Sequence, residues 1–124
     1  MHESYPLELG NIDVVRDWGS AREFVGVMWL SLQIDSDKLG ENIICTGTGR
    51  SLRDLVARMY ANVGLDWMEH VKISQKFIRN SDPSIIIGDP SGAINTLNWK
   101  HQFSFEDTID DLMDRTKLSL DRDW

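Results

Sequence analysis

Three serines mark helix starts along this chain of 124 residues, because each is followed three residues later by a carboxylate. The pairs are Ser20 with Glu23, Ser51 with Asp54, and Ser104 with Asp107. In such a pair the serine hydroxyl accepts a hydrogen bond from an early backbone N–H, and the positive end of the helix stabilises the acid. We therefore expect three helices to begin at these serines. A fourth is expected at Asp89-Pro90, since proline suits the first position of a helix.

Apolar side chains recur at helical spacing after these starts. The second helix carries Leu52, Leu55, Val56, Met59 and Val63, and the last carries Phe105, Ile109, Leu112 and Met113. Each set forms one stripe that needs a partner surface. Between Phe24 and Leu32 the first helix is apolar around almost its whole circumference. We therefore expect that helix to be buried on more than one side.

Short strands are expected between the helices. Residues rich in β-branched side chains and bounded by Gly, Asp and Ser indicate strands at 6–9, 13–15, 42–45, 71–73 and 85–87. From Asn42 to Lys117 strands and helices alternate, which predicts an α/β fold of short strands with about four helices. The tail from Leu118 to Trp124 lacks this pattern and is expected to fray.

The charge balance argues against nucleic-acid binding. A formal net charge of −7 repels a polyanion, and the 13 Lys and Arg residues are scattered. A small anion responds to the nearest donors, so a few convergent arginines still permit a phosphate ligand. No apolar run approaches the roughly 20 residues that cross a bilayer, and the first residues lack the pattern of a secretory leader. We expect a cytoplasmic protein without membrane contact.

The cysteine, histidine and tryptophan residues give little support for a catalytic or metal-binding site. The single cysteine, Cys45, follows two isoleucines and is expected to be a small buried hydrophobe. The histidines His2, His70 and His101 lack the spacing of metal ligands, so no metal site is expected. Residues 46–49, Thr-Gly-Thr-Gly, lack the spacing of a phosphate loop and are expected to form a turn. Four tryptophans are expected to pack in the core or in an interface: Trp18, Trp29, Trp67 and Trp99.

Short motifs follow one another in a distinctive order along the chain. They are Leu9-Gly10-Asn11, Arg16-Asp17-Trp18-Gly19, Met28-Trp29-Leu30, Gly88-Asp89-Pro90 and Leu97-Asn98-Trp99. The ordered set resembles the C-terminal part of the GDP-mannose 4,6-dehydratases, which belong to the extended short-chain dehydrogenase/reductase (NAD-dependent epimerase/dehydratase) superfamily. The likeness runs from about Leu9 to Lys117. The last two motifs are shared across the superfamily, whereas the first three favour the GDP-mannose branch.

The resemblance implies which residues face a nucleotide sugar. In the family, the arginine of the Arg-Asp-Trp-Gly motif and the arginine of an Arg-Pro-x-Glu motif face the diphosphate, and the carboxylate of the second motif binds a ribose hydroxyl. These roles fall on Arg16, Arg79 and Asp82. The chemistry agrees, because a guanidinium matches phosphate oxygens bidentately and a carboxylate accepts from a diol. The alternatives are solvated or helix-pairing arginines, and a turn at Asp82 before Pro83.

Three positions depart from the family pattern. Asn80 replaces a proline, Asp82 is one methylene shorter than the usual glutamate, and Ser20 replaces a histidine after the Trp-Gly pair. The freed backbone and the shorter acid are expected to weaken the contact with the ribose.

The catalytic half of such an enzyme is missing from the sequence. There is no glycine-rich dinucleotide fingerprint and no Tyr-x-x-x-Lys pair, since Tyr5 is followed at that distance by Leu9 and Tyr60 by Gly64. We expect no catalytic, cofactor-binding or metal-binding residue in this chain, although the resemblance implies NADP or NAD for the full-length family. Residues 1–117 are expected to form the substrate-side lobe without the N-terminal Rossmann part, as a truncated reading frame, a partial gene or a trimmed segment.

Three hypotheses for the function follow. The leading one is a partial nucleotide-sugar 4,6-dehydratase, a lyase segment that retains the diphosphate and ribose site but is inactive alone. The alternative is a non-catalytic interaction or oligomerisation module derived from that family. The third is a split enzyme completed by a separately encoded cofactor-domain chain. Because the helix after Ser20 would pack on the missing lobe, we expect exposed apolar surface and either a homo-oligomer or pairing with such a chain.

Overall fold

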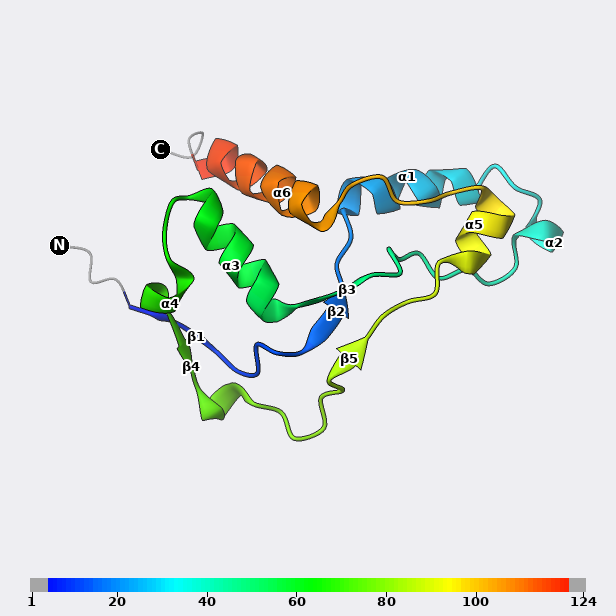
Figure 1. The fold of residues 1–124 in the computed structure, drawn as a ribbon. Coiled ribbons are helices and arrows are strands. Elements are labelled where there is room, and N and C mark those ends of the chain that lie inside the picture. The colour runs from blue at the N-terminus through cyan, green and yellow to red at the C-terminus, as the bar shows by residue number, and fades with distance from the viewer. Residues whose placement is uncertain (1–4, 121–124) are drawn as a thin grey trace.

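The computed structural model describes residues 5–120 and has a mixed α/β fold of six α-helices and five short strands. The elements are, in chain order, β1 (Leu7–Leu9), β2 (Val15–Asp17), α1 (Ala21–Ser31), α2 (Ser36–Leu39), β3 (Gly49–Ser51), α3 (Leu52–Asn62), α4 (Trp67–His70), β4 (Val71–Ile73), a 3-10 turn (Gln75–Phe77), β5 (Ile85–Ile86), α5 (Ser91–Leu97) and α6 (Phe105–Leu120). In Figure 1, α6 and α1 lie along one side of the molecule, and β1, β4 and β5 lie across from them. The predicted α/β class and the four longer helices are confirmed, and the short helices α2 and α4 are additions.

The strands form two small sheets. β1 pairs in parallel with β4, with Leu7 opposite Val71. In the second sheet β2 is the central strand, antiparallel to β3 and parallel to β5. Arg16, at the middle of β2, lies opposite Arg50 on one side and Ile86 on the other. The central strand of this sheet therefore carries the first predicted site residue.

Two of the three predicted serine caps are present. Ser51 Oγ accepts from the N–H of Asp54 at 3.0 Å, and Asp54 Oδ2 accepts from the N–H of Ser51 at 3.1 Å. The same exchange joins Ser104 and Asp107 at the start of α6. Each such cap contributes about 1 kcal/mol to helix stability. Helix α5 begins directly after Pro90 rather than at it, a shift of one residue from the prediction.

The predicted hydroxyl cap at Ser20 is wrong. Ser20 precedes α1 and is buried, but its side chain accepts no hydrogen bond from the first turn of that helix. The acid of the pair, Glu23, turns to the segment before α6 instead. Its Oε1 accepts from the N–H of Gln102 at 2.6 Å and from that of Phe103 at 3.3 Å. Glu23 therefore satisfies the backbone of a distant segment rather than the start of its own helix.

The predicted strand at residues 42–45 is wrong. Since β2 already has a neighbour on each side, this apolar run finds no free edge on β2. Its side chains are packed nonetheless: Ile44 lies against the main apolar cluster, and Cys45 is 6% exposed. A Cβ atom on Gly88 would come within 2.5 Å of Cys45 Sγ, so the close approach requires glycine there. The expectation that Cys45 is a small buried hydrophobe is confirmed.

The strand predicted at residues 13–15 begins and ends two residues later, as β2. The carbonyls of Val14 and Ile12 accept from the N–H groups of Leu52 and Arg53 at 3.0 and 2.8 Å. Those are the first donors of α3, which have no partner within the helix. The backbone carbonyls before β2 therefore bind the start of α3 rather than a neighbouring strand.

Apolar packing is concentrated at two places along the molecule. Between α1 and α5, Val27, Ala93 and Leu97 form a buried cluster, in which Val27 is completely enclosed. Where α3 and α6 lie together, Val56 and Ile109 are buried. Figure 1 shows these two helix pairs at different ends of the molecule.

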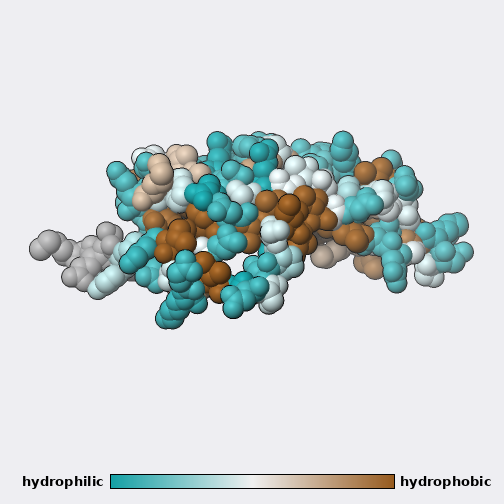
Figure 2. All heavy atoms as spheres, turned by 60° about the horizontal axis from the view of Figure 1, so that its bottom comes forward, coloured by the Kyte–Doolittle hydropathy of each residue, from teal (hydrophilic) through white to brown (hydrophobic). Residues whose placement is uncertain are grey.

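One face of α1 is not covered by any residue between 5 and 120. Its apolar residues recur at helical spacing and are 62–81% exposed: Val25, Met28, Trp29 and, just after the helix, Leu32. The expected burial on more than one side is thus met on the Val27 side only. Figure 2 shows further hydrophobic surface gathered across the middle of the face that is seen from below in Figure 1.

Helix α6 continues to Leu120, past the boundary at Lys117 where the frayed tail was expected to begin. The remainder of that tail, residues 121–124, and His2 near the other end lie outside the described residues. Between residues 5 and 120, no helix is both long enough and apolar enough to span a membrane.

Candidate functional site

Strand β2 holds Arg16 at the centre of the three-stranded sheet. Its Nη1 donates to the carbonyls of Val15 at 2.8 Å and Pro83 at 3.0 Å, and its Nη2 donates to Asp82 Oδ1 at 2.6 Å. The Arg16 side chain is 23% exposed and that of Asp82 is 36% exposed. Two carbonyls and one carboxylate therefore fix the guanidinium, while part of it stays accessible to a ligand.

Arg79 lies on the loop that also carries Asp82. Its carbonyl faces the N–H of Asp82 at 3.5 Å, a long contact. Its guanidinium makes no hydrogen bond or ion pair with any residue between 5 and 120, and the residue is exposed. The fold thus brings Arg16 and Asp82 into contact and places Arg79 three positions before Asp82 in the sequence. Whether Arg79 meets the same ligand as Arg16 stays a prediction.

Asp17, which the sequence reasoning did not single out, organises the end of β2. Its Oδ1 accepts from the N–H and the hydroxyl of Thr46, at 2.9 and 2.6 Å. Its Oδ2 accepts from the N–H of Gly47 at 2.9 Å and of Gly88 at 3.3 Å. One carboxylate thus binds the turn at Thr46 and Gly47, and Gly88 after β5, to the end of β2. An aspartate directly after the motif arginine, with a Thr-Gly turn further along the chain, was the available signal.

These contacts shift two proton equilibria. Partial burial would raise the pKa of the Asp17 carboxyl, but hydrogen bonds from Thr46, Gly47 and Gly88 outweigh it and hold that pKa below its ordinary value. Burial raises the pKa of the Cys45 thiol, and the nearby Asp17 carboxylate adds to the effect. Asp17 is therefore a charged anchor, and Cys45 is a protonated packing residue near neutral pH.

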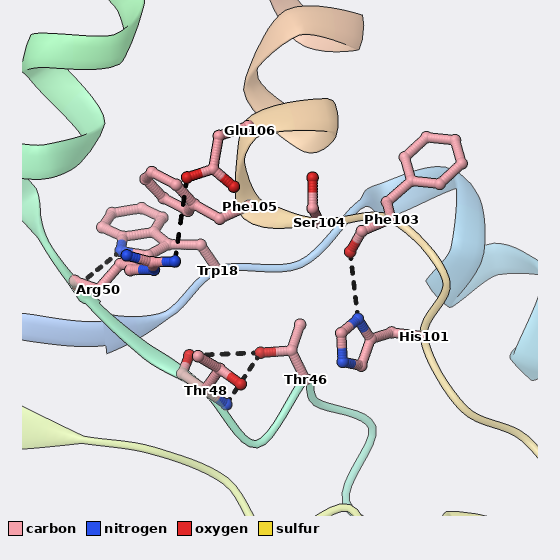
Figure 3. A pocket seen from close by; sticks show the side chains of 9 residues that line it. All are labelled: Trp18, Thr46, Thr48, Arg50, His101, Phe103, Ser104, Phe105 and Glu106. Atoms are coloured by element: carbon pink, nitrogen blue, oxygen red, sulfur yellow. Dashed lines mark hydrogen bonds and ion pairs between the residues drawn. The ribbon is translucent and has the colours of Figure 1, made fainter.

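A pocket of about 190 Å³ lies beside β2, lined neither by Arg16, Arg79 nor Asp82. Figure 3 shows its residues, which are Trp18 directly after β2, residues of the 46–50 segment, and residues between 101 and 106, where α6 begins. Trp18 Nε1 donates to the carbonyl of Arg50 at 3.0 Å, and the Arg50 guanidinium lies 5.4 Å from the centre of the Phe105 ring. The wall of the pocket is therefore partly aromatic and partly charged.

Metal binding finds no support in the part of the chain that the structure describes. Residues 5–120 contain no group of three or more His, Cys, Asp or Glu side chains placed to hold an ion.

Solved structures share this fold. The chain superposes on a dTDP-glucose 4,6-dehydratase from Bacillus anthracis in complex with NAD, with a TM-score of 0.79 at 14% identity over 97% of this chain and 37% of that one. RMD from Pseudomonas aeruginosa, complexed with NADPH, gives a TM-score of 0.74 at 18% identity, covering 92% of this chain and 36% of that one. The fold is therefore that of the C-terminal lobe of an extended short-chain dehydrogenase/reductase.

Sequence comparison narrows this class. The family model of GDP-mannose 4,6 dehydratase matches residues 1–112, so the chain belongs to that family. It is 33% identical over 108 residues to GDP-mannose 4,6 dehydratase 2 of Arabidopsis thaliana, covering 87% of this chain and 28% of that protein. With the human GDP-mannose 4,6 dehydratase it shares 30% identity over 124 residues, 86% of this chain and 33% of the relative. The chain thus spans about a third of the length of these relatives.

Proposed function

We propose that this chain is the substrate-side part of a nucleotide-sugar 4,6-dehydratase and binds the diphosphate of a GDP-sugar through Arg16 and Arg79. The contact between Arg16 and Asp82 carries the proposal, because it joins at one place two motif residues that are 66 positions apart in the chain. Arg16 is held by two carbonyls and remains in part accessible, and the Arg79 guanidinium has no competing partner among residues 5–120. A fixed guanidinium and a free one suit a ligand with two phosphate groups.

The dehydration itself would require residues outside this chain. In this superfamily a bound nicotinamide supplies the transient hydride transfer, and neither a dinucleotide fingerprint nor a Tyr-x-x-x-Lys pair occurs here. The residues of this chain would bind and orient the nucleotide sugar, and a cofactor-binding lobe would supply the dinucleotide site and the general base. The chain alone is then inactive as a dehydratase.

Isothermal titration with GDP and GDP-mannose tests the binding step. Each charge-assisted hydrogen bond to a phosphate is worth about 1.5–3 kcal/mol, so Arg16→Ala and Arg79→Ala should each weaken binding by about tenfold or more. Arg115→Ala is the matched control, because Arg115 is an exposed, ion-paired arginine on α6. Equal affinity in the wild-type chain and in both site variants would refute the proposed ligand contacts. NADP should not bind to the chain alone.

A second candidate is a non-catalytic interaction module. The exposed apolar face of α1 favours it, as does the substitution at Asn80 beside the proposed ligand residues. A split enzyme combines both ideas, since the face of α1 would then receive a separately encoded cofactor lobe. Inspection of the neighbouring reading frames for a glycine-rich fingerprint distinguishes the split enzyme from the module.

A further inference from the structure

The walls of the pocket in Figure 3 are held in place by carboxylates that do not themselves line the pocket. Asp17 holds the turn at Thr46 through the N–H and the hydroxyl of that residue. Glu23 holds the opposite wall through the N–H groups of Gln102 and Phe103. The exchange between Ser104 and Asp107 fixes the start of α6. Three segments distant in the sequence therefore meet around a preformed space rather than a flexible surface.

Several polar groups that line this pocket have unused hydrogen-bonding capacity. Within residues 5–120 the Arg50 guanidinium donates no hydrogen bond, and its nearest carboxylate oxygen, on Glu106, is 3.9 Å away. The Thr48 hydroxyl also has no partner in this range. His101 uses Nδ1 on the carbonyl of Phe103 at 3.1 Å, which leaves Nε2 available. In Figure 3 the side chains of Arg50 and His101 lie on opposite sides of the space.

The size and charge of the pocket indicate which class of ligand fits it. A volume of about 190 Å³ exceeds the roughly 150 Å³ that encloses a benzene ring, so one six-membered ring fits. Arg50 and Glu106 cancel in formal charge, which favours a neutral ligand over a free anion. Donors and acceptors lie on several sides, and Trp18 adds an apolar surface. A compact ring with several hydroxyl groups meets all of these conditions.

We propose that this pocket is a binding site for a neutral monosaccharide, separate from the diphosphate residues. The ring lies beside Trp18, and its hydroxyl groups bridge the Arg50 guanidinium and the Glu106 carboxylate, which are too far apart for a hydrogen bond between them. Thr48 and His101 Nε2 bind further hydroxyls. The site does not depend on the proposed GDP-sugar contacts, because Arg16, Arg79 and Asp82 do not line it.

Saturation-transfer NMR on the whole chain with methyl α-D-mannopyranoside tests this site. We expect transfer to the glycoside with a dissociation constant in the millimolar range, which is about −4 kcal/mol. Arg50→Gln and Glu106→Gln should each weaken binding about fivefold or more, because each loses a charge-assisted hydrogen bond. Thr48→Val is the smaller change that keeps the fold, and it should also weaken binding. The matched control is Arg53→Gln, since Arg53 is an exposed arginine paired with Asp13 and does not line the pocket.

Three outcomes would overturn the proposal. The first is no saturation transfer to the wild-type chain at about 20 mM glycoside, well above the expected dissociation constant. The second is equal weakening by Arg50→Gln and Arg53→Gln, which would assign the effect to net charge. The third is tight, Arg50-dependent binding of inorganic phosphate that displaces the glycoside, which would define an anion site instead.

Discussion

At the scale of single residues, the ion pair between Arg16 and Asp82 means that a bound phosphate competes with the Asp82 carboxylate for the Arg16 guanidinium. A phosphate that binds Arg16 meets the Asp82 carboxylate, whose Oδ1 is 2.6 Å from Arg16 Nη2. A nucleoside diphosphate compensates through its ribose hydroxyls, whereas free pyrophosphate has none. In Asp82→Asn, pyrophosphate should therefore bind about three- to fivefold more tightly and GDP more weakly. Arg16 stays placed in the variant, because the carbonyls of Val15 and Pro83 still hold it.

Calorimetry with both ligands measures this change in selectivity. Asp35→Asn, which removes an exposed partner of Lys38, controls for the altered net charge. A purely ribose-binding Asp82 would leave the affinity for pyrophosphate unchanged, and that result would refute the competition. The family likeness assigned Arg16 and Asp82 to one ligand, but the ion pair between them was beyond sequence reasoning, because no local pattern places β2 against the loop before β5.

Asp17 makes the stability of the fold dependent on pH. Its folded-state pKa is depressed, so its contribution is present above the unfolded value of about 3.9 and is lost as the pH falls through the folded value. Asp17→Asn should lower the free energy of unfolding by about 2 kcal/mol at pH 7, because an amide cannot accept from all the donors that face Asp17. Urea unfolding should show a clearly smaller difference from wild type at pH 3. Asp114→Asn is the control, because the Asp114 carboxylate on α6 makes no hydrogen bond or ion pair within residues 5–120. A pH-independent loss in Asp17→Asn would contradict this account.

At the scale of elements, α6 is held to α3 by few buried side chains. Ile109 is 2% exposed, whereas Leu112, one turn further along the same helix, is 50% exposed. Ile109→Ala should cost about 2–5 kcal/mol through lost transfer energy and the cavity left behind. Leu112→Ala should cost well under half of that, since the residue is already half exposed to water. Urea denaturation followed by circular dichroism compares the two, and equal costs would show that Ile109 is not the anchor.

The helices were more predictable from the sequence than the strands, and for a local reason. A capping box uses residues three positions apart, so Ser51 and Ser104 correctly predicted where their helices begin. Glu23 instead accepts a hydrogen bond from a segment some 80 positions away. A strand forms only beside another strand, and a short apolar run does not specify which segment that neighbour will be. The run at 42–45 therefore has no sheet partner. Gly49–Ser51, where the sequence indicated the end of the 46–49 turn and the start of a helix, pairs with β2 as β3.

At the scale of the whole molecule, α1 presents an apolar face that residues 5–120 leave exposed. Met28 and Trp29 are 64% and 62% exposed, and with Val25 and Leu32 they form one continuous helical stripe. A stripe of this kind is costly in water, so we expect two copies of the chain to associate through it when no other lobe is present. Light scattering after size exclusion at micromolar concentration should then give the mass of a dimer or larger.

The double variant Met28→Lys and Trp29→Lys tests whether association uses this stripe rather than the rest of the apolar surface. Two charges on the stripe would have to be buried in the associated form, so the variant should elute as a monomer with unchanged helix content. Leu118→Lys is the matched control, because Leu118 is 59% exposed on α6, away from α1, and its change should leave the assembly intact. Since Val27, not Met28 or Trp29, makes the buried contact with α5, the fold should survive the double change. A wild-type chain that is monomeric at these concentrations would refute self-association, and the stripe would then be reserved for a partner of different sequence.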